Sequence, residues 1–257
     1  MNPLSFRLDG KCALITGAGR GIGLAIGRTL AAYGAAVALQ DIDQDIAEKE
    51  AEAIRAAGGK AVAFGGDVRD LTLPSRLVPE AAKALGGLHI LINNAALQSH
   101  AYWREADPQT FEVELRSNLT VPMLMCQQAV AIFQPQRYGR IINLGSIQQL
   151  NGNPTMLSYS LSKSALHTMT RALARDLSKH GITVNLIAPG WIANTWRNRD
   201  DFPTPEAKEE YGKRIPLGRI GEPEDMAGVA LLLCSEAGSY ITGQSIFVDG
   251  GLSVGRA

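Results

Sequence analysis

The sequence has little of what several classes of protein require. It holds three cysteines, Cys12, Cys126 and Cys234, which lie far apart and within apolar stretches. Without a close pair they match neither a zinc site nor a redox motif, so we expect buried, reduced thiols. No stretch approaches the ~20 apolar residues of a membrane-spanning helix, and the first ten residues hold no long apolar segment. We therefore expect a cytoplasmic protein.

An excess of charge of one sign is also absent. The 25 Lys and Arg residues balance 25 Asp and Glu residues, and no run of like charge stands out. Proteins that bind nucleic acid or anionic membranes present a broad basic surface, so we expect neither partner and predict a small molecule instead. The histidines and acidic residues show no spacing typical of metal ligands, and we predict no metal site.

What the sequence does contain is a regular alternation of strand-like and helix-like segments. Its 257 residues, 46% of them hydrophobic, suit a single domain spanning residues 1–257. Short aliphatic runs predict strands at Cys12–Thr16, Ala36–Gln40, Ala61–Gly65, Leu88–Ile92, Arg140–Leu144, Thr183–Ile187 and Ser245–Val248. Segments of helical composition lie between them, at Ile22–Tyr33, Gln44–Ala57, Pro74–Leu85, Pro108–Phe133, Thr155–His180 and Pro223–Cys234.

This alternation predicts an α/β protein of three layers, a Rossmann-type fold whose seven-stranded, mostly parallel sheet is covered by helices on both faces. One long connection, Gly190–Pro216, has no clear period. Because long loops in compact domains are often functional, we predict a substrate lid at residues 190–216.

A glycine-rich turn joins the first strand to the first helix. Gly17, Gly21 and Gly23 there let the main chain approach a pyrophosphate at the positive end of the helix, with Arg20 and Ile22 beside them. By itself such a turn would equally suit a tight structural connection.

Asp41 ends the second predicted strand, about 20 residues beyond the glycines, where a carboxylate binds the adenosine ribose hydroxyls and repels a 2′-phosphate. Arg20 argues in the other direction, since it offers a cation to that phosphate. On balance the sequence favours NAD over NADP. The neighbouring Asp43 and Asp45 are better explained as the start of the next helix.

Four further residues suggest a reaction. Tyr159 and Lys163 are four apart on a predicted helix and share one face. A nearby ammonium group favours a phenolate, which would make the tyrosine a usable proton carrier. Ser146 follows the fifth strand, at the sheet edge where such folds bind ligands. Asn118 would disturb its predicted helix and hold a water beside the lysine. Each alone has an ordinary structural explanation, and a Tyr-x-x-x-Lys spacing is close to chance.

Together these motifs resemble the short-chain dehydrogenase/reductase family, with its Thr-Gly-x-x-x-Gly-x-Gly turn and Asn-Ser-Tyr-Lys tetrad. The resemblance runs from Gly10 to Gly251. It implies interconversion of a secondary alcohol and a ketone: Tyr159 takes the alcohol proton while hydride moves to the nicotinamide, Ser146 steadies the oxygen, and Lys163 and Asn118 relay the proton. It also implies a homotetramer, or failing that a dimer, and it adds cofactor contacts at Asp67, Val68, Asn94, Pro189, Gly190 and Ile192.

Two positions depart from the family pattern. Ala96 stands where a glycine is usual, which questions the local main-chain shape. Asn194 stands where a threonine is common, so the contact to the carboxamide of nicotinamide would pass to Asn194 or Thr195.

The segments that line substrate pockets in this family are rich in amides in this chain. They contribute Gln148, Asn153 and Trp191, which with Ser146 and Tyr159 are the predicted substrate contacts, and also Gln98 and His100. Amides suit hydroxyl groups, so a polyol or sugar is weakly favoured. Alternatives are an NADP-dependent carbonyl reductase, such as a 3-oxoacyl or steroid reductase, a sugar-nucleotide epimerase, which the glycine spacing disfavours, and an NAD-binding sensor or scaffold without turnover.

Overall fold

The computed structural model describes residues 5–193 and 204–255. Their strands form one seven-stranded sheet in the order β3-β2-β1-β4-β5-β6-β7, and every neighbouring pair is parallel. The predicted Rossmann-type fold is confirmed, with a sheet that is parallel throughout. The strands are β1 Cys12–Thr16, β2 Ala36–Asp41, β3 Lys60–Gly65, β4 Ile90–Asn93, β5 Gly139–Leu144, β6 Ile182–Pro189 and β7 Ser245–Val248.

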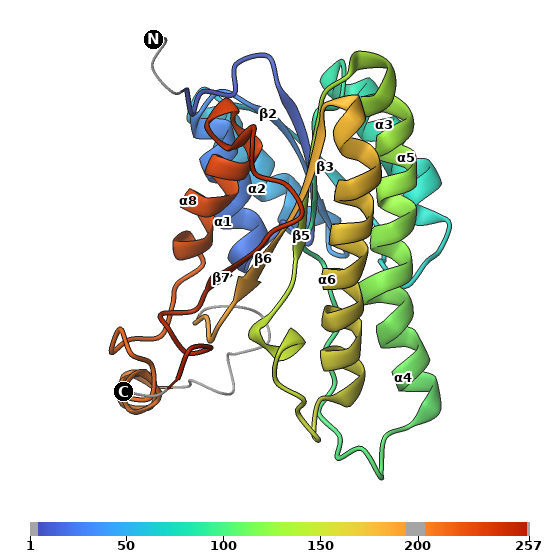
Figure 1. Cartoon of the computed structure of the whole chain (residues 1–257). Coiled ribbons are helices and arrows are strands. Elements are labelled where there is room, and N and C mark those ends of the chain that lie inside the picture. The colour runs from blue at the N-terminus through green and yellow to red at the C-terminus, as the bar shows by residue number, and fades with distance from the viewer. Residues whose placement is uncertain (1–4, 194–203, 256–257) are drawn as a thin grey trace.

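Helices cover both faces of the sheet (Figure 1). They are α1 Gly21–Ala32, α2 Gln44–Ala56, α3 Leu73–Leu85, α4 Pro108–Leu115, α5 Val121–Gln136, α6 Leu157–Leu177, α7 Pro205–Gly212 and α8 Glu224–Cys234. Helices α1, α2 and α8 lie on one face, and α3, α5 and α6 lie on the other. Successive strand residues therefore enter different cores: Ile15 packs towards α1 and Leu14 towards α3 and α5. The central strands are buried on both faces, which explains why their sequences are continuous apolar runs.

Most predicted elements match the structure to within three residues at each end, and the following differences bear on the site. The strand expected at Leu88–Ile92 begins at Ile90, and the single helix expected at Pro108–Phe133 is α4, a π-helical turn at Arg116–Thr120 and α5. The segment expected to be a loop contains α7, whose Thr204 side chain caps the helix by accepting from the Ala207 N–H. Thr204-Pro205-Glu206 was a helix-start signal, but α7 is only 8 residues long and lacks an apolar stripe.

The sheet topology selects the place for a ligand. Strand β1 lies between β2 and β4. From β1 the chain adds β2 and β3 on one side of the sheet and then crosses to add β4 on the other side, so the direction in which strands are added reverses between β1 and β4. In open parallel sheets the carboxyl ends of the strands at such a switch point border a ligand-binding crevice. The residues that follow β1, β4 and β5 include Gly17, Asn94 and Ser146, so this crevice brings the predicted site residues together.

The single-domain organisation stays a prediction, which the membership of all seven strands in one sheet supports. Positions 194–203 of the predicted lid at residues 190–216 lie outside the described residues. They include Asn194, Thr195 and Trp196.

Candidate active site

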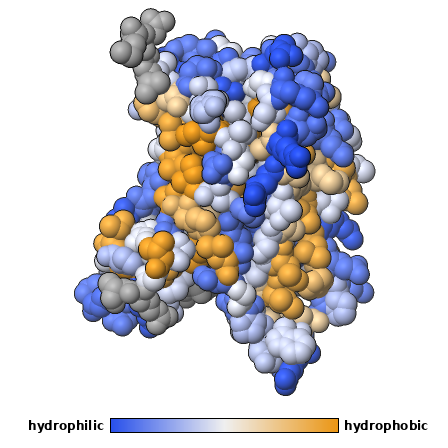
Figure 2. All heavy atoms as spheres, in the orientation of Figure 1, coloured by the Kyte–Doolittle hydropathy of each residue, from blue (hydrophilic) through white to orange (hydrophobic). Residues whose placement is uncertain are grey.

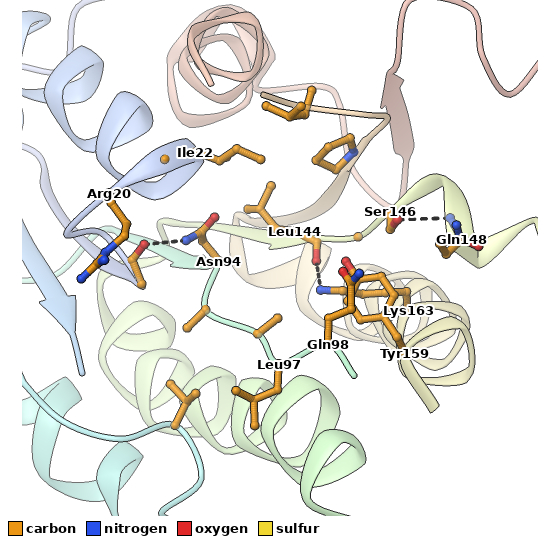
Figure 3. Close-up of a pocket in the computed structure, with 18 of the residues that line it drawn as sticks. Arg20, Ile22, Asn94, Leu97, Gln98, Leu144, Ser146, Gln148, Tyr159 and Lys163 are labelled. Carbon is orange, nitrogen blue, oxygen red and sulfur yellow. Dashed lines mark hydrogen bonds between the residues drawn. The ribbon is translucent and has the colours of Figure 1, made fainter. Parts of the chain in front are cut away.

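A cleft of about 960 Å³ opens along the carboxyl ends of the strands (Figure 3). Nearly all of the predicted site residues line it: Gly17, Arg20, Gly21, Ile22, Asp41, Asp67, Val68, Asn94, Ser146, Gln148, Asn153, Tyr159, Lys163, Pro189, Gly190, Trp191 and Ile192. Gly23 and Asn118 do not line the cleft, and any effect of theirs on a ligand passes through the residues that do.

The glycine turn is shaped by its own conformation and by one amide. Gly17 and Gly21 have φ of 62° and 57°, in the left-handed region that favours glycine. The Asn94 side chain donates hydrogen bonds to the carbonyls of Thr16, at 2.8 Å, and of Gly17, at 2.9 Å, one of which is drawn in Figure 3. A Cβ added to Gly23 would collide with the Gly17 carbonyl, so this glycine lets α1 begin directly beneath the turn.

Asp41 is held at the end of β2 by main-chain donors. Its side chain accepts from the N–H of Gly19 at 3.0 Å and from that of Asp43 at 3.2 Å, and the residue is only 6% exposed. A Cβ on Gly19 would lie 2.8 Å from the carboxylate, so a larger residue there would displace the Asp41 side chain. Sequence reasoning missed Gly19; the signal was a further glycine inside the turn.

Asp67 lines the same end of the cleft and forms an ion pair with Arg69, whose Nε donates to it at 2.7 Å. Hydrogen bonds from Arg69 hold the pKa of the Asp67 carboxyl below its usual range. The Arg69 cation, which also lines the cleft, is therefore already paired with a carboxylate.

The proposed reacting groups meet where α6 faces the end of β5. Tyr159 is 7% exposed and Lys163 is 3% exposed, and the ammonium lies 5.4 Å from the centre of the tyrosine ring. Lys163 Nζ donates to the Leu144 carbonyl at 2.6 Å, a bond drawn in Figure 3. Ser146 begins the 3₁₀ turn at Ile147–Gln149 and its Oγ accepts from the Gln148 N–H at 3.2 Å. Both side chains are thus fixed against the main chain of the β5 end.

Asn118 lies within the π-helical turn, so the helix is disturbed at the residue for which the sequence predicted it. Its Oδ1 accepts from the Leu97 N–H at 2.7 Å, while its Nδ2 donates to the Leu97 carbonyl at 2.8 Å and to Ser162 Oγ at 3.2 Å. Ser162 in turn donates to the Tyr159 carbonyl at 2.7 Å. Asn118 therefore joins the segment after β4 to α6, and its part in a water relay stays a prediction.

The other end of the cleft carries amides and aromatic rings. Gln148 Oε1 is buried and has no hydrogen-bond partner among the described residues. Asn153 accepts from the Thr155 N–H at 3.0 Å, and Trp191 meets Tyr211 of α7 edge-on, with ring centres 5.4 Å apart. Tyr211 also lines the cleft, and sequence reasoning missed it because α7 itself was missed.

The alanine in place of a family glycine causes no strain. Ala96 lines the cleft, and among the described residues only Arg137 combines a side chain with positive φ. The main chain at residue 96 therefore does not need the left-handed conformation that favours glycine.

A buried carboxylate that the sequence analysis did not single out lies behind this wall. Glu114 of α4 is 2% exposed and accepts hydrogen bonds from Ser99 and Ser158. The sequence feature that could have identified Glu114 is its spacing, because an acidic residue four positions before Asn118 lies on the same helix face. The helix that carries it, α4, packs against α6.

Comparisons with known proteins show the family to which the chain belongs. A family model described as enoyl-(acyl carrier protein) reductase matches residues 17–253. The chain is 34% identical to 2-(S)-hydroxypropyl-CoM dehydrogenase 3 of Xanthobacter autotrophicus, over 97% of this chain and 99% of the relative. The solved gluconate 5-dehydrogenase of Burkholderia cenocepacia, in complex with NADP and tartrate, is 34% identical with a TM-score of 0.90 over 97% of each chain. A short-chain type dehydrogenase/reductase of Mycobacterium marinum is 33% identical with a TM-score of 0.88, over 96% of this chain and 97% of that one.

The chain belongs to the short-chain dehydrogenase/reductase family. It is an enzyme, an oxidoreductase that uses a nicotinamide cofactor and interconverts secondary alcohols and ketones. The alternative of a sensor without turnover is thereby set aside.

The described residues include no helix long and apolar enough to cross a membrane. Within the same part of the chain, no group of three or more His, Cys, Asp or Glu side chains is arranged to hold a metal ion.

Proposed function

We propose that the protein oxidises a hydroxyl-rich secondary alcohol, a polyol or sugar, to the ketone with NAD, and catalyses the reverse reduction. The convergence of Tyr159, Lys163 and Ser146 on one cleft carries the proposal. Tyr159 takes the proton of the alcohol, Ser146 Oγ holds the reacting oxygen, and Lys163 favours the phenolate through its charge. A nicotinamide bound in this cleft would supply the hydride acceptor for the same carbon. Asn118 holds the wall behind these groups and continues the proton path.

Removing one hydroxyl tests the assigned proton carrier. Tyr159→Phe should lower kcat by about 10²- to 10⁴-fold, the usual contribution of a positioned acid or base. Binding of NADH, measured by fluorescence titration, should change little because the ring remains. Tyr240→Phe removes the same atom from a fully exposed residue and should behave as wild type. Near-normal hydride transfer by Tyr159→Phe would show that another group moves the proton.

The residues at the cofactor end fit a dinucleotide. The positive-φ glycines leave room for a pyrophosphate at the start of α1, with Arg20, Gly21 and Ile22 around it. Gly23 supports the turn from below, and Asn94 ties it to β4. All five of the next residues line the cleft: Asp67 and Val68 would border the adenine, and Pro189, Gly190 and Ile192 would border the nicotinamide. These assignments are part of the proposal.

The choice of NAD rests on Asp41. Its buried carboxylate, fixed by two N–H groups, would accept from the ribose hydroxyls and repel a 2′-phosphate. The residues that follow it, Ile42 and Asp43, supply no cation, and Arg69 is paired with Asp67. The solved gluconate 5-dehydrogenase holds NADP, so the preference cannot be carried over from that relative. The balance of charge in this chain supports NAD.

Steady-state kinetics with each cofactor measure the preference for NAD or NADP directly. Asp41→Ala should shift the ratio of kcat/KM for NAD and NADP by about tenfold towards NADP, through loss of hydrogen bonds to the ribose and of repulsion. Asp45→Ala removes an exposed carboxylate from the first turn of α2 and serves as the control. A wild-type enzyme that preferred NADP would overturn the assignment of Asp41.

The substrate class rests on Gln148. A buried acceptor without a protein partner is costly, and a hydroxyl group of the substrate would satisfy it. Asn153 and Trp191 line the same end of the cleft. The gluconate 5-dehydrogenase relative, named for a polyhydroxy acid, adds support. An assay of NADH formation or consumption across polyols, sugars, sugar acids, 3-oxoacyl thioesters and steroids tests the class. Activity confined to thioesters or steroids would contradict the proposed polyol or sugar substrate.

We place the enzyme in the cytoplasm as part of the same proposal. The three cysteines are buried and free, as expected of a compartment that keeps thiols reduced. Burial raises the pKa of Cys126 and of Cys234 to about 12, so neither is a reactive thiolate.

A further inference from the structure

The segment after β4 is anchored at every second residue. We call residues 97–101 the cleft strip. Leu97 exchanges two hydrogen bonds with the Asn118 side chain, and the Ala101 N–H donates to the Thr155 carbonyl at 3.0 Å. Gln98 and His100, which lie between these anchors, line the cleft, as does Leu97. Main-chain anchors on both sides of Gln98 and of His100 fix the directions in which these two side chains leave the segment.

Glu114 supplies the middle anchor. Its Oε1 accepts from the Ser99 N–H at 2.5 Å and its Oε2 accepts from Ser99 Oγ at 3.0 Å. The Oε2 also accepts a hydrogen bond from Ser158 Oγ. Three polar groups of Ser99 and Ser158 thus bind the two oxygens of this buried carboxyl group.

The two side-chain anchors come from one stretch of helix. Glu114 and Asn118 are four residues apart, at the end of α4 and in the π-helical turn, and both point at the cleft strip. They bind Leu97 and Ser99 as a neighbouring strand would bind alternate residues of an edge strand. Glu114 also reaches α6 through Ser158, which directly precedes Tyr159.

We propose that Glu114 is a positioning residue for substrate recognition. Its carboxylate fixes Ser99, and through it the directions of Gln98 and His100, and it sets the cleft strip against the turn of α6 that carries Tyr159. The inference rests on the proposed placement of the substrate beside Gln98 and His100. A role in packing alone does not explain the residue, because an apolar side chain would fill this 2% exposed site without the cost of burying a polar group.

Three variants separate positioning from packing. Glu114→Leu removes every hydrogen bond to the two serines and should raise the substrate KM by about tenfold, while the Kd of NADH stays within about twofold, since these bonds are lost only at the substrate end. Glu114→Gln keeps one carbonyl acceptor for the Ser99 N–H and an NH₂ group for the hydroxyls, so it should restore most of the affinity. Glu112→Gln, on the exposed side of the same helix, is the matched control and should behave as wild type.

Hydrogen exchange gives a readout that does not depend on activity. The Ser99 amide should be protected in wild type and in Glu114→Gln, and should exchange faster in Glu114→Leu while the amides of β4 stay unchanged. Should Glu114→Leu fail to fold, Ser158→Ala reports on the link to α6 and should lower kcat with NADH binding retained. If Glu114→Leu folds with unchanged KM and unchanged Ser99 exchange, Glu114 is not a positioning residue.

Failure of this inference can be distinguished from failure of the proposed function. Gln98→Ala and His100→Ala test whether the substrate lies against the cleft strip, independently of Glu114. If they leave KM unchanged, the placement of the substrate is wrong. If they raise KM and Glu114→Leu does not, the placement stands and the assignment of Glu114 is overturned.

Discussion

Single polar side chains around the cleft bind main-chain groups more than they bind one another. Lys163 donates to the Leu144 carbonyl, Asn94 donates to the carbonyl of Gly17, and Asp41 accepts from the Gly19 N–H. Such bonds satisfy main-chain groups that a parallel sheet leaves unpaired where its strands end. They also fix each functional side chain before a ligand arrives, which lowers the cost of binding and reaction.

One histidine away from the cleft should make stability depend on pH. His89 Nδ1 accepts from the Cys12 N–H at 3.1 Å, and burial, with Lys11 nearby, lowers the pKa of His89 below its usual 6.5. The unfolded chain therefore takes up a proton first as pH falls. Above about 6.5 both states are neutral; below it the free energy of unfolding decreases until the folded pKa is passed, and then levels off.

Denaturant unfolding at several pH values between about 7.5 and 5.5 checks this sign. His89→Gln should remove the part of the slope that His89 causes, whereas His180→Gln should keep it. An equal slope in wild type and His89→Gln would assign the pH dependence to other groups.

At the scale of elements, short irregular turns decide where the side chains point. The π-helical turn at Arg116–Thr120 interrupts what the sequence predicted as one helix, and Asn118 lies inside it. Such turns occur frequently at functional sites, because the extra residue leaves main-chain bonds open and redirects side chains. Here the turn allows Asn118 and Glu114 to hold the cleft strip from one helical stretch.

Two glycines in helices should respond oppositely to alanine. In α1, a Cβ on Gly23 would collide with the Gly17 carbonyl, so Gly23→Ala should distort the turn, weaken NADH binding by at least about tenfold and destabilise the fold by about 1–3 kcal/mol. Gly228 lies in the middle of α8, is exposed, and has nothing within 4 Å of an added Cβ.

Gly228→Ala should therefore stabilise the fold by about 0.5–1 kcal/mol, the usual difference in helix propensity. Thermal unfolding and NADH titration of both variants check the contrast. Destabilisation by Gly228→Ala would indicate that this face of α8 packs against another chain.

At the scale of the whole molecule, we propose assembly into a homotetramer. Leu161 on α6 is 46% exposed and Met123 on α5 is 38% exposed, on the two longest helices of the described chain. Figure 2 shows hydrophobic residues gathered over the lower half of α6. Exposed apolar surface of this kind supports a subunit interface.

Sedimentation velocity tests the assembly. Leu161→Glu should shift wild-type tetramers towards dimers or monomers, because a charge would be buried in the contact. Leu71→Glu changes a residue of similar exposure, 45%, outside these helices and should leave the assembly unchanged. A monomeric wild-type protein at micromolar concentration would contradict the proposal.

The sequence by itself determined the seven strands and their alternation with helices, the glycine turn, and the face shared by Tyr159 and Lys163. These follow from local rules, namely the periods of strands and helices and the conformational freedom of glycine. It also identified the carboxyl edge of the sheet as the site, because parallel strands end on the same side.

Only the tertiary structure decided which partners these residues meet. Asn94 lies 77 residues from Gly17, and Glu114 lies 44 residues from Ser158, separations that no local pattern reports. The same is true of Gly19 against Asp41 and of α7, which carries Tyr211 to the cleft. Folding brings distant segments to one edge, where each buried polar group has to find a partner. Those partners, rather than the residues alone, give the cleft its shape.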